Sequence, residues 1–289
     1  WSSKSTLLII NSGENNTFAD NSISINSDKI SGIQLTKTNS NNISNNEFNL
    51  NGNSVKAIIL DSSKDNVIEG NIFLSDANDI IFIESTKSMN NNIIKNTLKG
   101  NASSIYGYYA SNSNYGHIVQ NNIEIKGTSN ITDQSGIYIK GSSARNDVID
   151  NHIESFSRNG DDYAVMIIAN KNLYNSITNN FLMSSNGAKR ANEAVYAQYG
   201  TVKDNAPIDI YVSASGSDET GDGSIYRPYA SITKAIENSL NHAVIYVGSG
   251  HYNETDINMN KNVTICSNGK NVIIDAQSSQ LFNIDQNGI

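Results

Sequence analysis

Apolar residues recur along the chain in a fixed relation to asparagine. The motif apolar-x-x-Asn-x-apolar first occurs as Phe18…Asn21…Ile23, and successive copies place the asparagine 25, 25, 25, 25, 30, 29 and 25 residues further on, the last copy being incomplete. A fixed period of this length is typical of a repeat architecture, and the longer intervals fit short loop insertions. The asparagines of the motif are Asn21, Asn46, Asn71, Asn96, Asn121, Asn151, Asn180 and Asn205.

A second segment with alternating apolar and polar residues precedes the asparagine in most repeats, for example at Leu8/Ile10 and Ile33/Leu35. Alternation with a period of two indicates strands with one buried face. Two or three such strands within 25 residues leave no room for a helix. We therefore predict that residues 1–205 are the later coils of an all-β solenoid, in which parallel coils stack about 4.8 Å apart and no coil buries its apolar face alone.

The recurring asparagine is expected at the tight bend between two strands. Asparagine tolerates the left-handed backbone conformation that such a bend requires. When coils are in register, each side-chain amide can donate to and accept from the amides of the coils above and below. The eight asparagines are therefore predicted to form one structural ladder.

After Asn205 the repeat stops and a different pattern begins. A strand-like run at 208–212 and a polar loop lead to the segment 231–240, which reads as a helix with Ser231 at its N-cap. A short amphipathic helix can cover the apolar end of a solenoid, so residues 206–289 are predicted to be the helix-capped start of a second β-helix. The apolar residues that share one face of this helix are Ile232, Ala235, Ile236 and Leu240.

The run IYVSASGSDETGDGSIYRPYASITKAIENSLNHAVIYVGSGHYNE, residues 210–254, resembles the opening segment of pectate-lyase-like right-handed parallel β-helix domains. Together with the Asn-rich coils before it, it is most similar to the adhesin-like surface proteins of methanogenic archaea. The resemblance implies a right-handed β-helix in a secreted, cell-wall-associated protein of many stacked domains. We therefore expect an extracellular structural or adhesive module rather than an enzyme, with surface glycans or other cells as its partners.

Composition and charge narrow the classes of function. Charged residues make up only 17% of the chain, and the net charge is −8. Because no cluster of Lys and Arg suits phosphate binding, nucleic acid is not expected as a partner. No apolar run approaches the roughly 20 residues of a membrane span. Six N-glycosylation sequons are compatible with a secreted glycoprotein, at Asn15, Asn42, Asn101, Asn130, Asn253 and Asn262.

Candidate metal-binding residues are few. Asp218, Glu219 and Asp222 lie in a Gly-rich loop and have the oxygen ligands that calcium prefers, but their spacing matches no standard calcium loop. A polar turn before the helix is their expected role. The four histidines show no metal-binding spacing and are expected in surface turns. The single cysteine, Cys266, lies in an apolar run and is expected to be buried. No metal or cofactor is therefore predicted.

Candidate catalytic residues are equally few. The pair Asp161-Asp162 matches one motif of polygalacturonases, whereas the other motifs of those enzymes are missing. A solvated loop pair is the expected role, and no catalytic residue is predicted. The alternative function is a polysaccharide-active enzyme, either a pectate-lyase-like lyase or a glycoside hydrolase, whose carboxylates meet only in three dimensions.

Tyrosines offer a possible contact surface for sugars. A tyrosine ring is apolar on its face and polar at its tip, and it therefore stacks well on sugar rings. The other expected location for these residues is the core or the capping loops. The tyrosines concerned are Tyr106, Tyr108, Tyr109, Tyr115, Tyr138, Tyr163 and Tyr174.

The sequence begins at Trp1 and ends at Ile289 within a solenoid pattern, and neither end carries a recognisable cap. Uncapped β-helix ends present free strand edges, and such edges pair. We therefore expect the solenoid to continue in a longer polypeptide, or to associate head to tail as a fibre.

Overall fold

The computed structural model describes residues 3–128, 134–157, 163–170, 174–184, 194–205, 209–221, 223, 225, 227–239 and 243–284. Contacts divide the chain into two compact units. Unit 1 comprises Trp1–Asn186 and Asn192–Asp204, and unit 2 comprises Gly187–Ala191 and Asn205–Ile289. Several residues singled out in the sequence lie outside the described residues, namely Asn130, Asp161, Asp162, Asp222 and Leu240.

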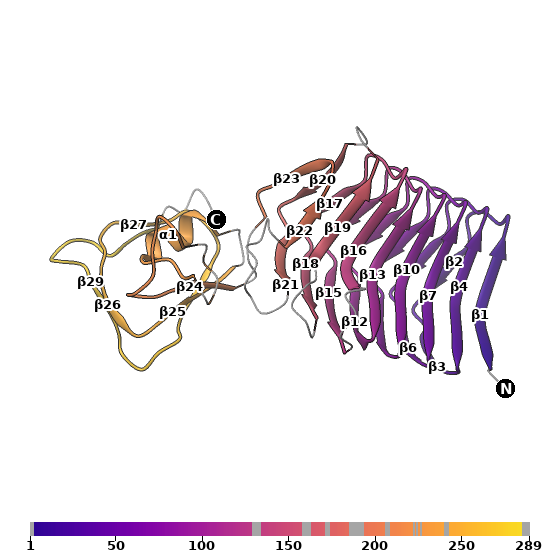
Figure 1. Cartoon of the computed structure of the whole chain (residues 1–289), viewed down its shortest axis with the longest axis horizontal. Coiled ribbons are helices and arrows are strands. Elements are labelled where there is room, and N and C mark those ends of the chain that lie inside the picture. Colours follow the sequence, from indigo (N-terminus) through magenta and orange to yellow (C-terminus); the bar gives the residue numbers. More distant parts are fainter. Residues whose placement is uncertain are drawn as a thin grey trace. The chain divides into compact units, whose positions relative to one another are not determined.

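Unit 1 is a stack of coils, and each described coil except the last contributes one strand to each of three parallel sheets (Figure 1). The first sheet holds the longest strands, most of them eight residues long. In spatial order they are β1 (Lys4–Asn11), β4 (Lys29–Thr36), β7 (Ser54–Asp61), β10 (Asp79–Thr86), β13 (Ser104–Ser111), β16 (Gln134–Gly141), β19 (Tyr163–Ala169) and β22 (Val195–Ala197).

The second and third sheets follow the same order of coils. The second consists of β2 (Thr17–Ala19), β5 (Asn42–Ser44), β8 (Val67–Glu69), β11 (Asn92–Ile94), β14 (His117–Val119), β17 (Asp147–Ile149), β20 (Asn175–Thr178) and β23 (Gly200–Lys203). The third consists of β3 (Ser22–Asn26), β6 (Glu47–Asn51), β9 (Ile72–Asp76), β12 (Thr97–Ala102), β15 (Asn122–Gly127), β18 (His152–Phe156) and β21 (Phe181–Ser184).

The core of unit 1 consists of apolar ladders that run perpendicular to the strands. Ile33 pairs in register with Ile58, and Ile58 with Ile83, so the alternation seen in the sequence places one buried residue above another. Phe48 and Phe73 stack in the same way, with ring centroids 4.8 Å apart and planes 9° apart. Each coil buries its apolar residues only against its neighbours. The expected fold class, a parallel β-helix, is confirmed.

Unit 2 contains shorter coils of the same parallel kind and one helix. Its strands form three small sheets, β24-β25-β28, β26-β29 and β27-β30. The helix contacts β24, β25 and β27. The elements are β24 (Asp209–Val212), α1 (Ile232–Glu237), β25 (Val244–Val247), β26 (Gly250–Asn253), β27 (Ile257–Met259), β28 (Thr264–Ser267), β29 (Val272–Asp275) and β30 (Phe282–Ile284).

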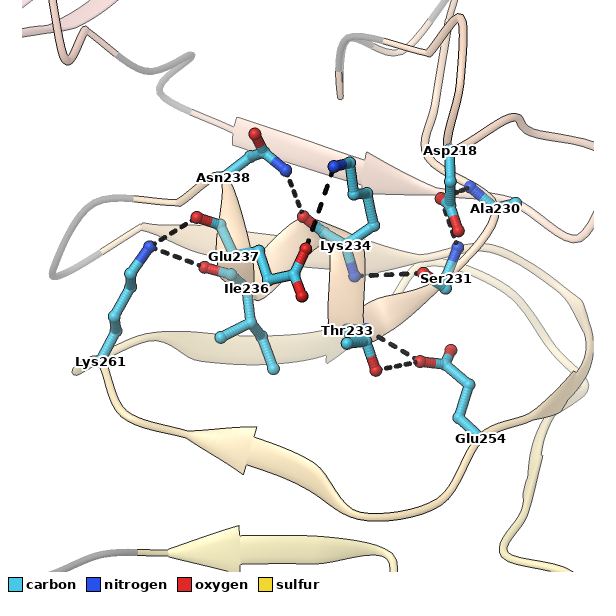
Figure 2. A network of polar contacts seen from close by, with 10 residues as sticks. All are labelled: Asp218, Ala230, Ser231, Thr233, Lys234, Ile236, Glu237, Asn238, Glu254 and Lys261. Carbon is cyan, nitrogen blue, oxygen red and sulfur yellow. Dashed lines mark hydrogen bonds and ion pairs between the residues drawn. The ribbon is translucent and has the colours of Figure 1, made fainter.

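Helix α1 is shorter than the sequence suggested, because it ends at Glu237 rather than at residue 240. The ammonium group of Lys261 donates hydrogen bonds to the backbone carbonyls of Ile236 and Glu237, at 3.0 and 2.8 Å (Figure 2). It also donates to the carbonyl of Ser239, at 2.7 Å. These are carbonyls that a longer helix would use for its own hydrogen bonds. A lysine more than 20 residues away in sequence therefore helps to fix where the helix stops.

The other end of α1 is held by one carboxylate, that of Glu254, and by the hydroxyl of Ser231. Ser231 is the N-cap and its hydroxyl accepts from the backbone N–H of Lys234. The Glu254 carboxylate accepts from the N–H groups of Ile232 and Thr233, at 2.7 and 2.8 Å. Figure 2 shows Glu254 and Lys261 reaching the helix from the chain that follows it. The apolar face of α1 is buried, through Ile232, Ala235 and Ile236.

Candidate functional site

The bends between the second and third sheets carry a ladder of asparagine side chains. The backbone N–H and the side-chain amide of Asn46 both donate to Oδ1 of Asn71, at 2.9 and 3.0 Å. The same pair of bonds joins Asn71 to Asn96. The amide of Asn71 also donates to the backbone carbonyl of Ile43, at 2.8 Å. The ladder runs without a gap through Asn21, Asn46, Asn71, Asn96, Asn121, Asn151 and Asn180, and Asn205 follows β23 at the matching position.

The left-handed backbone conformation at these bends does not belong to the ladder asparagine, and the expectation that it would was wrong. The residue before it adopts that conformation, for example Asp20 (φ 58°), Asn45 (φ 54°) and Lys95 (φ 53°). The chain turns at this residue, and the asparagine that follows is directed inward. Asn46 and Asn71 are consequently buried, with at most 1% of their surface exposed. The left-handed backbone conformation strains a non-glycine residue. The hydrogen bonds of the buried asparagine ladder offset the cost of this strain.

A second asparagine ladder lies at the bends between the first and second sheets, and the repeat motif did not reveal it. Asn41 donates to Oδ1 of Asn66 through its backbone N–H and its amide, both at 3.0 Å. The available signal was a second asparagine five residues before six of the eight motif asparagines. Its members are Asn16, Asn41, Asn66, Asn91, Asn146 and Asn175, and a hydroxyl ladder of Thr38, Ser63, Ser88, Ser113 and Ser143 runs beside it.

Gly116 replaces the asparagine in one coil of this second ladder. Its backbone N–H still donates to Oδ1 of Asn146, at 2.8 Å. A Cβ atom on Gly116 would lie 2.8 Å from Oδ1 of Asn146, which would have to shift, and 3.5 Å from the hydroxyl of Tyr108, so the tyrosine occupies space beside the missing side chain. Tyr108 is buried in the core, with 2% of its surface exposed, and burial raises its pKa to about 12. Tyr108 therefore cannot form part of an outer contact surface.

Three other tyrosines form a cluster on the outer face of the first sheet. Tyr106 and Tyr138, on neighbouring coils, stack with ring centroids 5.4 Å apart and planes 18° apart. Tyr109 stands edge-on to both rings, at 5.5 Å from each. The ammonium group of Lys140 lies 5.0 Å from the centre of the Tyr109 ring, within the range of a cation–π contact. We call Tyr106, Tyr109, Tyr138 and Lys140 the tyrosine cluster; all four are half-buried.

The remaining candidate tyrosines lie elsewhere in unit 1. Tyr163 starts strand β19 and contacts the ring of Tyr196, with centroids 5.5 Å apart. Tyr115 and Tyr174 occupy left-handed bends, and 72% of the Tyr174 surface is exposed. The structure therefore gathers only part of the predicted set into one place.

The outer face of the third sheet carries a charged cluster that the sequence did not reveal. Lys99, Glu124 and Glu154 lie in register on β12, β15 and β18. Lys99 donates to Glu124 at 2.5 Å, and this hydrogen bond lowers the pKa of the Glu124 carboxyl. Glu154 lies 3.2 Å from Nε2 of His152. A general acid needs a raised pKa, so the lowered pKa of Glu124 favours an ion pair over acid catalysis.

In the loop considered as a weak calcium candidate, Asp218 makes hydrogen bonds within the protein. Oδ1 of Asp218 accepts from the backbone N–H groups of Ala230 and Ser231, at 2.8 and 3.1 Å. Glu219 is exposed. Across the described part of the chain, no group of three or more His, Cys, Asp or Glu side chains could hold a metal ion.

The histidines, the cysteine and one sequon asparagine differ in location or burial from what the sequence suggested. His117 and His152 lie within strands β14 and β18 rather than in turns. Cys266 is half-buried. Among the described sequons, Asn42 is half-buried, and its Oδ1 is enclosed without a hydrogen-bond partner. The sequon asparagines that are exposed are Asn15, Asn101, Asn253 and Asn262.

The parallel coils and their internal amide ladders define a parallel β-solenoid. The family model described as the right handed beta helix region matches residues 1–123. This match and the solenoid together support a right-handed β-helix superfamily, whose fold is compatible with either a structural or an enzymatic role. Comparison with curated proteins and with solved structures gave no match. Within the described residues, no helix is long and apolar enough to cross a membrane.

Proposed function

We propose that this chain is an extracellular structural and adhesive module at the cell surface, a rigid β-helix that contacts glycans or other cells. The observation that carries the proposal is the tyrosine cluster on the outer face of the first sheet. Tyrosine supplies a large, rigid, amphipathic contact area at low conformational cost. A cluster of this kind on a regular sheet suits contact with an extended partner better than enclosure of a small substrate.

The interior of unit 1 supports the structural part of the proposal. A continuous amide ladder ties neighbouring coils together at one bend, and a second amide ladder, interrupted at Gly116, and a hydroxyl ladder do so at another. Each buried amide in these ladders makes hydrogen bonds to protein groups in place of those that it would make to water in the unfolded chain. A coil can therefore leave the stack only if it breaks several buried hydrogen bonds at once, which favours a stiff scaffold.

A glycan array tests the adhesive part of the proposal. The full chain is compared with Tyr109→Ala and with Tyr138→Ala on immobilised cell-surface polysaccharides. We expect each variant to lose at least about tenfold in apparent affinity, because each removes part of a half-buried aromatic contact. Tyr174→Asn is the matched control, since Tyr174 is far more exposed and asparagine tolerates its left-handed backbone. Equal binding by all three variants would contradict the proposal.

A polysaccharide-active enzyme is the second candidate function, and the register of Glu124 and Glu154 favours it. Glycoside hydrolases use two carboxylates, one of them a general acid. Glu124 and Glu154 lie side by side in register on β15 and β18, and the lowered pKa of Glu124 leaves Glu154 as the candidate acid. Release of reducing ends from a panel of polysaccharides tests this activity. Turnover that Glu154→Gln abolishes, with the fold retained, would establish the enzyme and displace the structural proposal.

A further inference from the structure

The outer face of the third sheet contains a hollow that spans β12, β15 and β18. It has a volume of about 160 Å³, and a neighbouring hollow of about 290 Å³ shares two of its lining residues, Lys126 and Phe156. Two rows of side chains line the first hollow, and each row follows the register of the three strands. The rows are Lys99, Glu124 and Glu154, and Asn101, Lys126 and Phe156.

The charges that line this hollow balance each other. Two ammonium groups, from Lys99 and Lys126, accompany the two carboxylates of Glu124 and Glu154. Lys99 pairs with Glu124, and His152 lies beside Glu154. A strongly charged ligand would lose its hydration without finding a net opposite charge. A neutral ligand with hydroxyl groups can donate to the carboxylates and accept from the ammonium groups.

Phe156 adds an apolar wall at one end of the same hollow. Its side chain is half-buried and lines both hollows. Pyranose rings combine apolar C–H faces with a rim of hydroxyl groups, and binding sites typically pair an apolar surface with a few convergent polar groups. The hollow is smaller than the roughly 300–1,000 Å³ of sites for larger ligands, so it suits a single ring.

We propose that this hollow binds one ring of a neutral saccharide, with Phe156 against the ring and the two glutamates and two lysines on its hydroxyl groups. The site lies on a different sheet from the tyrosine cluster. It extends the proposed function to a second contact face, and it does not depend on whether the tyrosine cluster binds glycans.

Calorimetric titration of the full chain tests the site with two neutral probes, cellotetraose and maltotetraose, and one acidic probe, tetragalacturonate. We expect at least one neutral probe to bind, and Phe156→Ala to weaken its binding about tenfold, in line with the loss of an aromatic contact. Glu154→Gln should also weaken binding. Phe181→Ala is the matched control, because Phe181 is a half-buried phenylalanine on the same sheet that does not line the hollow. It should change the affinity less than about twofold.

The outcomes separate this site from the tyrosine cluster. Loss of binding in Phe156→Ala with binding retained in Tyr109→Ala supports the hollow, whatever the tyrosines do. The reverse result places the saccharide at the tyrosine cluster and overturns this inference while the proposed function stands. The inference also fails if neither neutral probe binds at about 10 mM, if tetragalacturonate binds more tightly than both, or if Phe181→Ala loses as much as Phe156→Ala. Circular dichroism of each variant establishes that the fold is retained.

Discussion

The two units satisfy their buried polar groups in different ways. Unit 1 repeats one neutral device in every coil, in which an asparagine amide and backbone N–H donate to the next asparagine. Unit 2 uses single charged side chains at unique places, with Glu254 at the start of α1 and Lys261 at its end. The asparagine ladder requires coils that repeat in register. The charged side chains of unit 2 instead hold helix α1, an element without a repeat.

The difference has consequences for stability. A ladder amide donates and accepts at the same time, so removing one leaves partners unsatisfied on both sides. A charged side chain at a helix end complements the helix dipole, with only part of its surface buried. Unit 1 should therefore be more sensitive to a change in a single buried amide than unit 2 is to the loss of a charge.

Replacing Asn71 by alanine should have the largest effect. The backbone N–H of Asn46 loses its acceptor. The side-chain amide of Asn46 and the backbone carbonyls of Ile43 and Glu69 each lose one hydrogen bond, although Glu69 still accepts from the N–H of Asn45. We expect the free energy of unfolding of unit 1 to fall by about 3 kcal/mol, because buried unsatisfied groups cost about 1–3 kcal/mol each and partial relaxation recovers some of this. Urea titration measures the loss. Asn49→Ala, at an exposed position of β6, should change stability by less than about 0.5 kcal/mol; a similar loss in both variants would show that the ladder contributes nothing special.

Filling the interrupted ladder tests whether the gap at Gly116 is matched to Tyr108. Gly116→Asn should destabilise unit 1 by about 2 kcal/mol, since the new side chain overpacks the site. Adding Tyr108→Ile should recover most of that loss, because Ile83 and Ile137 occupy the same register position in the neighbouring coils. A double-mutant cycle measures the coupling. Strictly additive effects would mean that the two residues are independent.

Removing the charge at the end of α1 should have a smaller effect. Lys261→Met takes away two hydrogen bonds to helix carbonyls and one to the carbonyl of Ser239 just beyond the helix, and should lower the stability of unit 2 by about 1–2 kcal/mol. Hydrogen exchange of the α1 amides detects the loss, and thermal unfolding ranks it. Lys234→Met is the control, because Lys234 makes only a 3.9 Å ion pair with Glu237 on the helix surface. If the two lysines have equal effects, Lys261 does not fix the helix end.

The smallest effect should appear at acid pH. The hydrogen bond from Lys99 lowers the pKa of Glu124 in the folded state. Its contribution to stability is therefore present above the pKa of the unfolded state and is lost as the pH falls through the lowered folded value. Glu124→Gln should make stability less dependent on pH between about 5 and 3. Urea titrations at several pH values measure this slope, and an unchanged slope would contradict the assignment.

The sequence alone predicted the class of fold and the first ladder. The 25-residue period fixed which apolar residues stack, since a residue and its equivalent one coil later must meet in a parallel register, as Ile58 and Ile83 do. The same period brought Asn46 over Asn71. Ser231 could be recognised as an N-cap because a cap depends on residues within one turn.

Other features depend on contacts that no local pattern encodes. The left-handed residue at the bends of the first ladder is variously Asp, Asn, Gly, Lys or Gln, so composition does not identify it. The cluster of Lys99, Glu124 and Glu154 arises because a 25-residue and a 30-residue coil keep the same strand register. The end of α1 is set by Lys261, which follows it in a later loop. Sequence periodicity determined what stacks in the core of this protein, whereas the tertiary structure decided which side chains meet on its surface and at its bends, because those meetings depend on how loops of unequal length return the chain to a common register.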